Sequence, residues 1–420
     1  MNIYFSGLGG VGMGPLAEIA RDAGYSVYGS DLEVSLMTAK LHGDGIDVHI
    51  GPQDGRFLHE THRKTPLDWF VYTPAIPEGH PELVLARELG IKTAKRGEYL
   101  AHFIEATSLK LLAVSGTHGK TTTTGMLVWT LKQLGVPISY SIGSTIGFGP
   151  SGLYDPKSEY FVYECDEFDR NFLYFHPHLA IISSVDYDHP DTYPTEDDYK
   201  SAFRQFIQQS NMTILWQHDA EFIVTNEASA WSLQDNEILN TTLTGLHNRR
   251  NATLVLKAIE RIGIGESKTN KIALKDFPGT DRRFEKLADN LYSDYGHHPT
   301  EIAATLQMAR EISDHVVLVY QPHQNIRQHE IRHDYKAQFE LADEVYWLPT
   351  YLSREDPKLA ILSPDELIQD ITNKDHIHVA DFNDELWNTI EAARLEGKLV
   401  LGMGAGRIDS WLRQQLSKSI

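Results

Sequence analysis

Lys120 and the hydroxyl side chains beside it could bind a phosphate, because they follow an apolar run and two glycines. The run Leu111–Val114 predicts a buried strand, Gly116 and Gly119 predict a loop, and a helix is expected from Thr121. Such a loop presents backbone N–H groups and the positive end of a helix dipole to an anion. Lys120 could then reach the outer phosphates of a nucleotide, and the Thr121 hydroxyl could ligate Mg²⁺. The alternative is a polar strand-to-helix turn with a capping threonine. The loop is two residues shorter than the general phosphate-loop pattern.

A second glycine motif opens the chain. Residues 2–6 predict a strand, Gly7-Leu-Gly9-Gly10-Val-Gly12 follows it, and a helix is expected over residues 15–23. Another strand over residues 25–31 would deliver Asp31 at the distance seen in nucleotide-binding βαβ units. The motif favours a nucleotide diphosphate and leaves a dinucleotide and a nucleotide-sugar both possible. A glycine turn that serves only helix packing is the alternative.

Acidic and amide side chains follow the phosphate loop. The expected strands at residues 160–164 and 179–185 would bring Glu164, Asp188 and His189 to the sheet edge that carries Lys120. This edge is where a magnesium nucleotide would bind, although acidic clusters also form plain solvated loops. Asn248 and Asn251, three residues apart on an expected helix, could pair with a base edge. The alternative for Asn248 is helix capping.

The alternation of strands and helices predicts an α/β protein of three domains, with Rossmann-like first and third domains and a central phosphate-loop domain. We place the domains at residues 1–107, 108–277 and 278–420. Other expected elements are strands at 69–77, 212–216, 222–224, 291–294, 315–320 and 398–401, and helices at 82–90, 97–106, 203–207 and 301–310.

The composition limits the possible partners. A formal charge of −20 over 420 residues argues against an extended nucleic-acid or anionic-membrane surface. No long uncharged apolar run and no charged-then-apolar leader is found, so neither secretion nor a membrane span is expected. The single cysteine, Cys165, excludes an intrachain disulfide and fits a reducing cytoplasm.

These motifs and their order resemble the Mur ligases of peptidoglycan synthesis, and the resemblance covers essentially the whole chain. The shortened phosphate loop is the form that this family uses. The other matching motifs are Glu164-Cys-Asp-Glu167, Asp188-His189, Gly245-Leu-His-Asn-Arg-Arg-Asn-Ala252, Arg282-Arg-Phe-Glu285 and Asp294-Tyr-Gly-His-His-Pro-Thr-Glu301. Within the family, the opening glycines, the His-His-Pro-Thr-Glu run and the Gln-Pro-His stretch are most similar to the alanine-adding branch.

The resemblance implies a set of residue roles. Mg²⁺ would be held by Thr121, Glu164 and His189, and Lys120, His189, Arg283 and His297 would be catalytic. ATP would be bound by Gly116, Thr117, His118, Gly119, Lys120, Thr121, Thr122, His247, Asn248, Asn251, Arg283 and Asp294. The other substrates would be bound by Gly9, Gly10, Gly12, Ser30, Asp31 and Arg327.

The resemblance also implies a reaction. ATP would phosphorylate the carboxylate of UDP-N-acetylmuramate, and L-alanine would attack the acyl phosphate, in a cytoplasmic monomer or homodimer without nucleic-acid or membrane partners. Three residues depart from the branch: Gln324 stands in place of an arginine that would help hold the incoming carboxylate, Phe168 in place of a serine, and Arg407 in place of an aspartate. The alternatives are a recycling ligase that accepts a whole peptide, an NAD-dependent oxidoreductase built on the first glycine motif, and a non-catalytic nucleotide-binding regulator.

Overall fold

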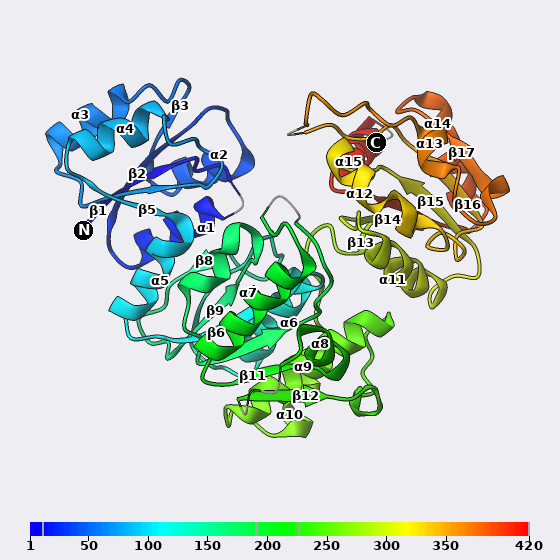
Figure 1. The fold of residues 1–420 in the computed structure, drawn as a ribbon, viewed down its shortest axis with the longest axis horizontal. Coiled ribbons are helices and arrows are strands. Elements are labelled where there is room, and N and C mark those ends of the chain that lie inside the picture. The colour runs from blue at the N-terminus through cyan, green and yellow to red at the C-terminus, as the bar shows by residue number, and fades with distance from the viewer. Residues whose placement is uncertain (11, 190–191, 226, 228, 354, 419–420) are drawn as a thin grey trace. The chain divides into compact units, whose positions relative to one another are not determined.

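The chain folds into two compact units, each with its own sheet structure (Figure 1). The computed structural model describes residues 1–10, 12–189, 192–225, 227, 229–353 and 355–418. Unit 1 comprises Met1–Leu239 and Asn251–Pro278, and unit 2 comprises Asn240–Arg250 and Gly279–Ile420. The segment at residues 240–250 thus groups with the C-terminal part of the chain, while the domain limits expected from the sequence stay a prediction.

The first sheet of unit 1 is fully parallel, with the strand order β3-β2-β1-β4-β5. The carboxyl ends of its strands therefore meet at one edge, where the glycine motif follows β1. Its strands are β1 (Asn2–Ser6), β2 (Ser26–Asp31), β3 (Asp47–Ile50), β4 (Trp69–Tyr72) and β5 (Lys92–Lys95). Its helices are α1 (Met13–Asp22), α2 (Leu36–Gly43), α3 (Arg56–Lys64), α4 (Pro81–Glu88) and α5 (Arg96–Ala106).

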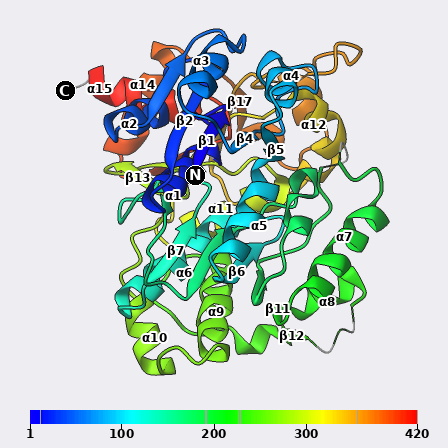
Figure 2. The ribbon, with the colours of Figure 1, turned by 90° about the vertical axis from the view of Figure 1, so that its left-hand side faces the viewer.

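The second sheet of unit 1 has the order β12-β11-β10-β6-β9-β7-β8, and its central strand β6 leads into the phosphate loop. Its strands are β6 (Lys110–Ser115), β7 (Ile138–Ser141), β8 (Gly152–Leu153), β9 (Tyr160–Glu164), β10 (Leu179–Ile182), β11 (Thr213–Trp216) and β12 (Ala230–Leu233). The helices that follow in this part of the chain are α6 (Lys120–Gln133), α7 (Glu196–Gln209), α8 (Gln217–Ile223), α9 (Leu246–Arg261) and α10 (Ser267–Leu274). Helix α10 packs against α6 (Figure 2), where Trp129 donates its indole N–H to the Ala273 carbonyl at 2.9 Å.

One expected strand of this sheet is wrong. The apolar residues at 222–224 predict a strand, but the structure continues helix α8 through Ile223 and ends it at Val224 in a left-handed conformation with φ of 58°. The side chain of Ile223 is fully buried. A short apolar run does not distinguish a strand from the buried end of a helix, and tertiary packing decides between them here.

Unit 2 holds a third sheet with the order β13-β14-β18-β15-β16-β17, parallel except for the β13–β14 pair. Its strands are β13 (Glu285–Ala288), β14 (Leu291–Asp294), β15 (Val316–Tyr320), β16 (Glu344–Trp347), β17 (Ile377–Val379) and β18 (Leu399–Met403). Its helices are α11 (Pro299–Arg310), α12 (Asn325–Ile331), α13 (Pro364–Ile368), α14 (Asp384–Leu395) and α15 (Ile408–Lys418).

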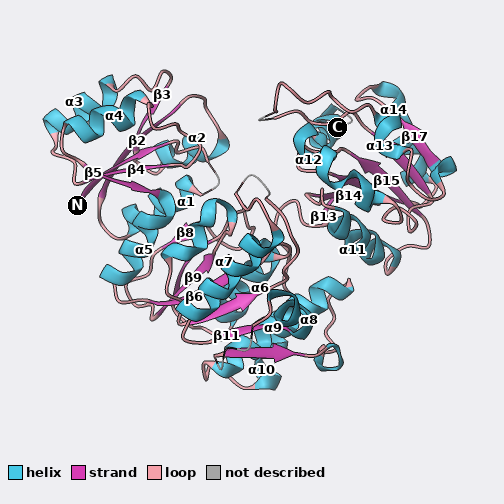
Figure 3. Cartoon of the chain, in the orientation of Figure 1, coloured by secondary structure: helices cyan, strands magenta, loops and turns pink. Residues whose placement is uncertain are grey.

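Helices and strands alternate along the chain, as Figure 3 shows in cyan and magenta. The central strands β6 and β15 are buried at every apolar position, which is the pattern of strands covered on both faces of a parallel sheet. The expected α/β class is confirmed. Among the helices that the structure describes, none combines the length and the apolar character needed to cross a membrane.

Candidate functional site

The loop between β6 and α6 has the backbone of an anion-binding turn. Gly116 has φ of +131°, and a Cβ built on it would lie 2.6 Å from the Ser184 carbonyl oxygen. Gly119 has φ of +81° and immediately precedes α6. Both positions therefore need glycine, and the helix begins at Lys120, one residue before the expected start. Thr122 lies partly buried in the first turn of this helix.

The loop is fixed in place by the residues that follow β10. The Thr117 hydroxyl donates to the Asp186 carbonyl at 2.7 Å and accepts the Asp186 N–H at 2.8 Å. The His118 N–H donates to Ser184 Oγ at 3.0 Å, and its ring Nε2 lies 3.4 Å from Asp186 Oδ2. This part of the loop is thus held before any ligand arrives, which lowers the ordering cost of binding.

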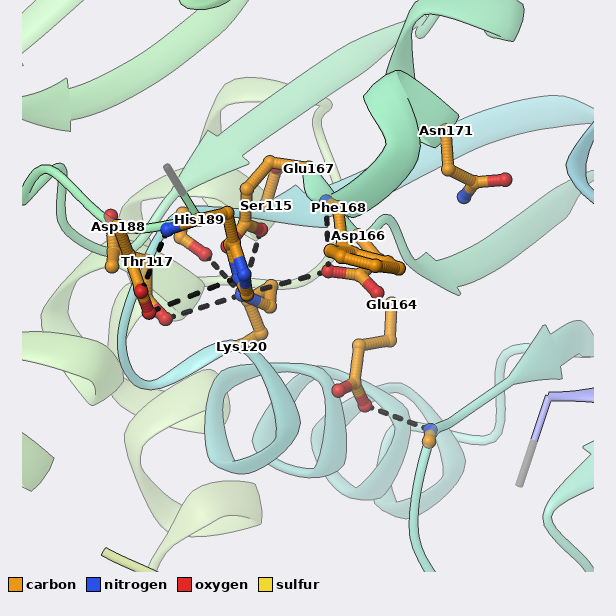
Figure 4. A network of polar contacts seen from close by, with 12 residues as sticks. Ser115, Thr117, Lys120, Glu164, Asp166, Glu167, Phe168, Asn171, Asp188 and His189 are labelled. Atoms are coloured by element: carbon orange, nitrogen blue, oxygen red, sulfur yellow. Dashed lines mark hydrogen bonds and ion pairs between the residues drawn. The ribbon is translucent and has the colours of Figure 1, made fainter. Parts of the chain in front are cut away.

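Lys120, Glu167 and His189 form a buried network of alternating charge (Figure 4). Lys120 Nζ donates to both carboxylate oxygens of Glu167, at 2.9 and 2.7 Å. His189 Nε2 lies 3.5 Å from Glu167 Oε1, and the Glu167 side chain is fully buried. The network therefore keeps a cationic lysine beside the glycine loop.

The charged forms are favoured in this network. Burial disfavours the Lys120 ammonium, but the carboxylates of Glu167 and Asp166 outweigh it and raise the pKa of Lys120. Burial likewise opposes the Glu167 carboxylate, yet Lys120 and His189 lower the pKa of Glu167. The pKa of His189 is raised despite burial, because the ring hydrogen-bonds Glu167 and lies near Asp188.

Thr121 and Glu164 come together at the end of β9. Thr121 Oγ1 donates to Glu164 Oε1 at 2.7 Å, and Glu164 Oε2 accepts the Gly143 N–H at 2.8 Å. Their hydroxyl and carboxylate oxygens are hard donors of the kind that Mg²⁺ prefers. Two of the three expected metal ligands are therefore adjacent, while His189 makes its contact with Glu167.

Sequence reasoning singled out Glu164, the last residue of β9, and missed Glu167 in the turn that follows, which is the partner of Lys120. The signal was two glutamates three residues apart after a buried strand. Asp166 lies between these two glutamates in the sequence. Burial and, to a smaller extent, the charge of Glu167 raise the pKa of Asp166, while the charges of Lys120 and Arg96 lower it. Cys165 is fully buried, and burial raises the pKa of its thiol.

The residues expected at a base are divided between the two units. Asn251 belongs to unit 1 and packs on the phosphate loop, since a Cβ on Gly119 would lie 3.1 Å from its Nδ2. His247 and Asn248 belong to unit 2. Asn248 Nδ2 donates to the Thr244 carbonyl at 3.0 Å, and burial lowers the pKa of His247 to about 4.

At the first glycine motif, Gly9 donates its N–H to Asp31 Oδ2 at 2.6 Å, and Gly10 donates to the Gly7 carbonyl at 3.2 Å. Gly12 directly precedes α1. Ser30 is fully buried and donates its hydroxyl to Glu82 Oε2 at 2.8 Å. Its side chain thus supports the loop from the core. The buried Glu82, which the sequence did not single out, also accepts hydroxyl hydrogens from the side chains of Tyr4 and Ser6.

The remaining expected residues, Arg283, Asp294, His297 and Arg327, lie in unit 2. Asp294 accepts backbone N–H groups from Phe284 and Gly296 at 2.8 and 2.7 Å, and burial raises its pKa to about 6. Burial lowers the pKa of His297 to about 3, and its Nε2 contacts the guanidinium of Arg327. The Arg283 guanidinium lies 5.2 Å from the centre of the Tyr295 ring.

The three residues that depart from the alanine-adding pattern occupy separate places. The Phe168 and His189 ring centres are 5.2 Å apart (Figure 4). Gln324 has φ of 60° and donates from Nε2 to Ser353 Oγ at 3.2 Å. The Arg407 guanidinium lies over the Phe382 ring at 4.3 Å.

A phosphate loop with a cationic lysine, followed by paired hydroxyl and carboxylate oxygens, defines a nucleotide-binding α/β enzyme. Three family models match this chain: the Mur ligase family catalytic domain at residues 2–107, the Mur ligase middle domain at 114–233, and the Mur ligase glutamate ligase domain at 282–406. The chain belongs to the Mur ligase family, a family of ATP-dependent ligases, and the expected resemblance is confirmed.

Individual relatives narrow the likeness further. The UDP-N-acetylmuramate–L-alanine ligase of Caldanaerobacter subterraneus is 31% identical over 97% of this chain and 95% of that protein. The solved UDP-N-acetylmuramate-alanine ligase of Thermotoga maritima is 25% identical with a TM-score of 0.79, covering 100% of this chain and 99% of that one. The murein peptide ligase of Psychrobacter arcticus shares the fold, with a TM-score of 0.66, 23% identity and coverage of 99% and 98%.

Proposed function

We propose that this protein joins L-alanine to the carboxylate of UDP-N-acetylmuramate, releasing ADP and phosphate, as a step in the synthesis of peptidoglycan precursors. The observation that carries the proposal is the whole-length likeness to the L-alanine ligases, combined with a phosphate loop whose lysine is held ready in cationic form. The reaction would take place in the cytoplasm, in a monomer or a homodimer.

In unit 1, the proposed chemistry begins with ATP at the phosphate loop. Gly116, Thr117, His118, Gly119 and Thr122 would surround its phosphates, and Lys120 would leave Glu167 to contact the outer ones. Mg²⁺, when bound, would be held by Thr121 and Glu164, with His189 as the third residue, and would supply compensation for the charge of the phosphates. Asn251 would contact the adenine.

The resemblance assigns further nucleotide contacts to residues of unit 2. His247 and Asn248 would receive the adenine, Asp294 the ribose, and Arg283 the phosphates. His297 would contact the reacting groups, and Arg327 the incoming amino acid. Cationic groups are required because a carboxylate must attack a polyanion, so positioning and charge compensation do most of the catalytic work.

The other substrate would bind at the first glycine motif. The backbone of Gly9, Gly10 and Gly12 would hold the diphosphate of UDP-N-acetylmuramate, with Asp31 and the Ser30 backbone beside it. The lactyl carboxylate would take the terminal phosphoryl group of ATP to give an acyl phosphate. The amine of L-alanine would then attack the acyl carbon and expel phosphate.

The test is phosphate release with UDP-N-acetylmuramate, ATP and one amine donor at a time. We expect release with L-alanine, and weaker release with glycine or L-serine. The recycling ligase is the second candidate, because Phe168 stands beside His189 where the alanine-adding branch has a serine. Release with L-alanyl-γ-D-glutamyl-diaminopimelate and none with L-alanine would replace the first candidate by the second.

A further inference from the structure

Arg96 places a guanidinium group directly on the first glycine motif. It is the first residue of α5 and follows β5 at the sheet edge that carries the motif. A Cβ built on Gly12 would lie 1.7 Å from Nη1 of Arg96 and 2.7 Å from Cζ. Gly12 has φ of −106°, which any residue can adopt. A larger residue at position 12 would therefore displace the flexible end of the Arg96 side chain, whereas glycine leaves the guanidinium beside the start of α1.

This guanidinium is unpaired. Within the part of the chain that the structure describes, the Arg96 side chain makes no hydrogen bond or ion pair, and its Nε is buried without a partner. The adjacent cation is neutralised, because Lys95 Nζ lies 2.8 Å from Asp169 Oδ2. The charge of Arg96 lowers the pKa of Asp166 without an ion pair between the two side chains, so a directly bound anion would still recover part of the desolvation cost of Arg96.

The position of Arg96 is set by residues on both sides of it. Lys95 is tied to Asp169, and a Cβ on Gly97 would lie 1.8 Å from Asn171 Oδ1. Asp169 and Asn171 belong to the turn that follows β9, so this three-residue segment is fixed between the two sheets of unit 1. The backbone of Arg96 is thus held independently of its own side chain, and a change of that side chain can be tested without undoing the junction.

The two ends of the motif carry opposite charges. At Gly9 the Asp31 carboxylate accepts the backbone N–H at 2.6 Å, which suits a hydroxyl-bearing part of a ligand and repels a phosphate. At Gly12 the Arg96 guanidinium lies beside the N-terminus of α1, where the helix dipole also favours an anion. A forked guanidinium can bind two phosphate oxygens at once.

We propose that Arg96 binds the diphosphate of the UDP-linked substrate and thereby selects nucleoside diphosphates over nucleosides at this motif. This inference rests on the proposed function, because it assumes that the glycine motif holds the UDP substrate. The Arg96 guanidinium would share the diphosphate with the N–H groups at the start of α1. Asp31 would face the ribose end.

The test is calorimetric binding of UDP-N-acetylmuramate, UDP and uridine to the full-length wild-type protein and to R96Q and R96K. For R96Q we expect the affinity for both diphosphates to fall roughly 10- to 100-fold, the size of one charge-assisted bidentate contact. Uridine and ATP affinities should change less than about 3-fold. R96K, which keeps the charge without the fork, should lie between R96Q and the wild type.

The matched control is K92A, which removes an exposed positive charge at the start of the same strand, β5. It should leave the discrimination between UDP and uridine unchanged. Equal weakening of uridine and UDP in R96Q would show a merely structural role and overturn the proposal, as would unchanged UDP binding.

A kinetic measurement separates this inference from the proposed function. If wild-type protein releases phosphate with L-alanine but R96Q keeps the wild-type KM for UDP-N-acetylmuramate, only the Arg96 proposal fails. If the wild type releases no phosphate with UDP-N-acetylmuramate and any amine donor, the proposed function fails.

Discussion

The polar groups around Lys120 in unit 1 and three buried polar groups of unit 2 respond to burial in opposite ways. In unit 1, Lys120, Glu167 and His189 alternate in charge, and each has its pKa displaced toward the charged form. In unit 2, burial lowers the pKa of His247 to about 4 and of His297 to about 3. Burial there also raises the pKa of Asp294 to about 6. The unit 2 groups are therefore displaced toward their neutral forms.

The difference reflects what surrounds each group. Glu167 has cations on two sides, so the Coulomb attraction exceeds the cost of desolvation. His297 has a carboxylate, Glu301, on one side, but Arg327 and His323 on the other, and desolvation prevails. A phosphate-binding lysine needs a stored positive charge, whereas a buried histidine next to an arginine is most stable without one. Ion pairing thus keeps Lys120, Glu167 and His189 charged, whereas burial favours the neutral forms of His247, His297 and Asp294.

The largest expected effect comes from breaking the paired network with Lys120→Ala. We expect kcat to fall by at least about 10³-fold, because the loop loses its point charge for the transferred phosphoryl group. Binding of UDP-N-acetylmuramate should stay nearly unchanged in calorimetry, because this substrate is proposed to bind at the other glycine motif. Lys132→Ala, near the end of the same helix, is the control and should keep wild-type turnover. Equal loss of turnover and of UDP-substrate binding would argue against separate sites.

Acidification should charge the two buried histidines of unit 2, His247 and His297, and thereby destabilise the folded protein. The folded pKa values of His247 and His297, about 4 and about 3, lie below the ordinary value of 6.5. Their contribution to stability is therefore complete above pH 6.5 and is lost as the pH falls toward 4. The pKa of Asp294 is about 6 in the folded protein, above its ordinary value of 3.8, so protonation of Asp294 stabilises the fold as the pH falls. This gain offsets most of the stability lost through one of the two histidines. The net loss between pH 7 and pH 4 should be on the order of 3–4 kcal/mol.

Scanning calorimetry at several pH values measures this loss. His247→Gln should flatten the pH dependence of unfolding, whereas His59→Gln, at an exposed position of unit 1, should leave it as in the wild type. If His247→Gln and the wild type showed the same pH dependence of unfolding, the proposed contrast between the two units would be wrong.

The smallest effect is expected from an ion pair near the surface of unit 2. Arg249 binds Glu311 through two hydrogen bonds of 2.8 Å, with 25% and 27% of the two side chains exposed. Solvent screens such a pair, so Arg249→Met should reduce the free energy of unfolding by about 0.5–1 kcal/mol. A double-mutant cycle with Glu311→Gln measures the coupling. A coupling above about 2 kcal/mol would place this pair with the buried network of unit 1.

Local pattern was sufficient for much of the fold. The expected strands at residues 2–6, 160–164 and 291–294 match β1, β9 and β14 residue for residue, because each is a short segment with an apolar core or start between turn residues. The local pattern gave the wrong element at residues 222–224, where a short apolar run forms the end of helix α8. Strand β12 was not expected either, because it is a short edge strand with two exposed residues.

The site was predicted as far as its motifs are continuous in the chain. The loop at residues 116–121 and its glycine conformations follow from local spacing. The partners at long range do not: Glu167 lies 47 residues from Lys120, and Arg96 meets Gly12 from the end of β5, another strand of the first sheet. No periodicity connects such positions, because their contact depends on the strand order of each sheet.

The buried Cys165 has a practical consequence for following this enzyme in solution. Its thiol is fully enclosed and its pKa is raised by burial, so the reactive thiolate is scarce and inaccessible to alkylating reagents. It is also the sole cysteine of the chain. A single cysteine introduced at an exposed site would therefore accept a fluorophore or a spin label selectively, with the native sequence around the phosphate loop left intact.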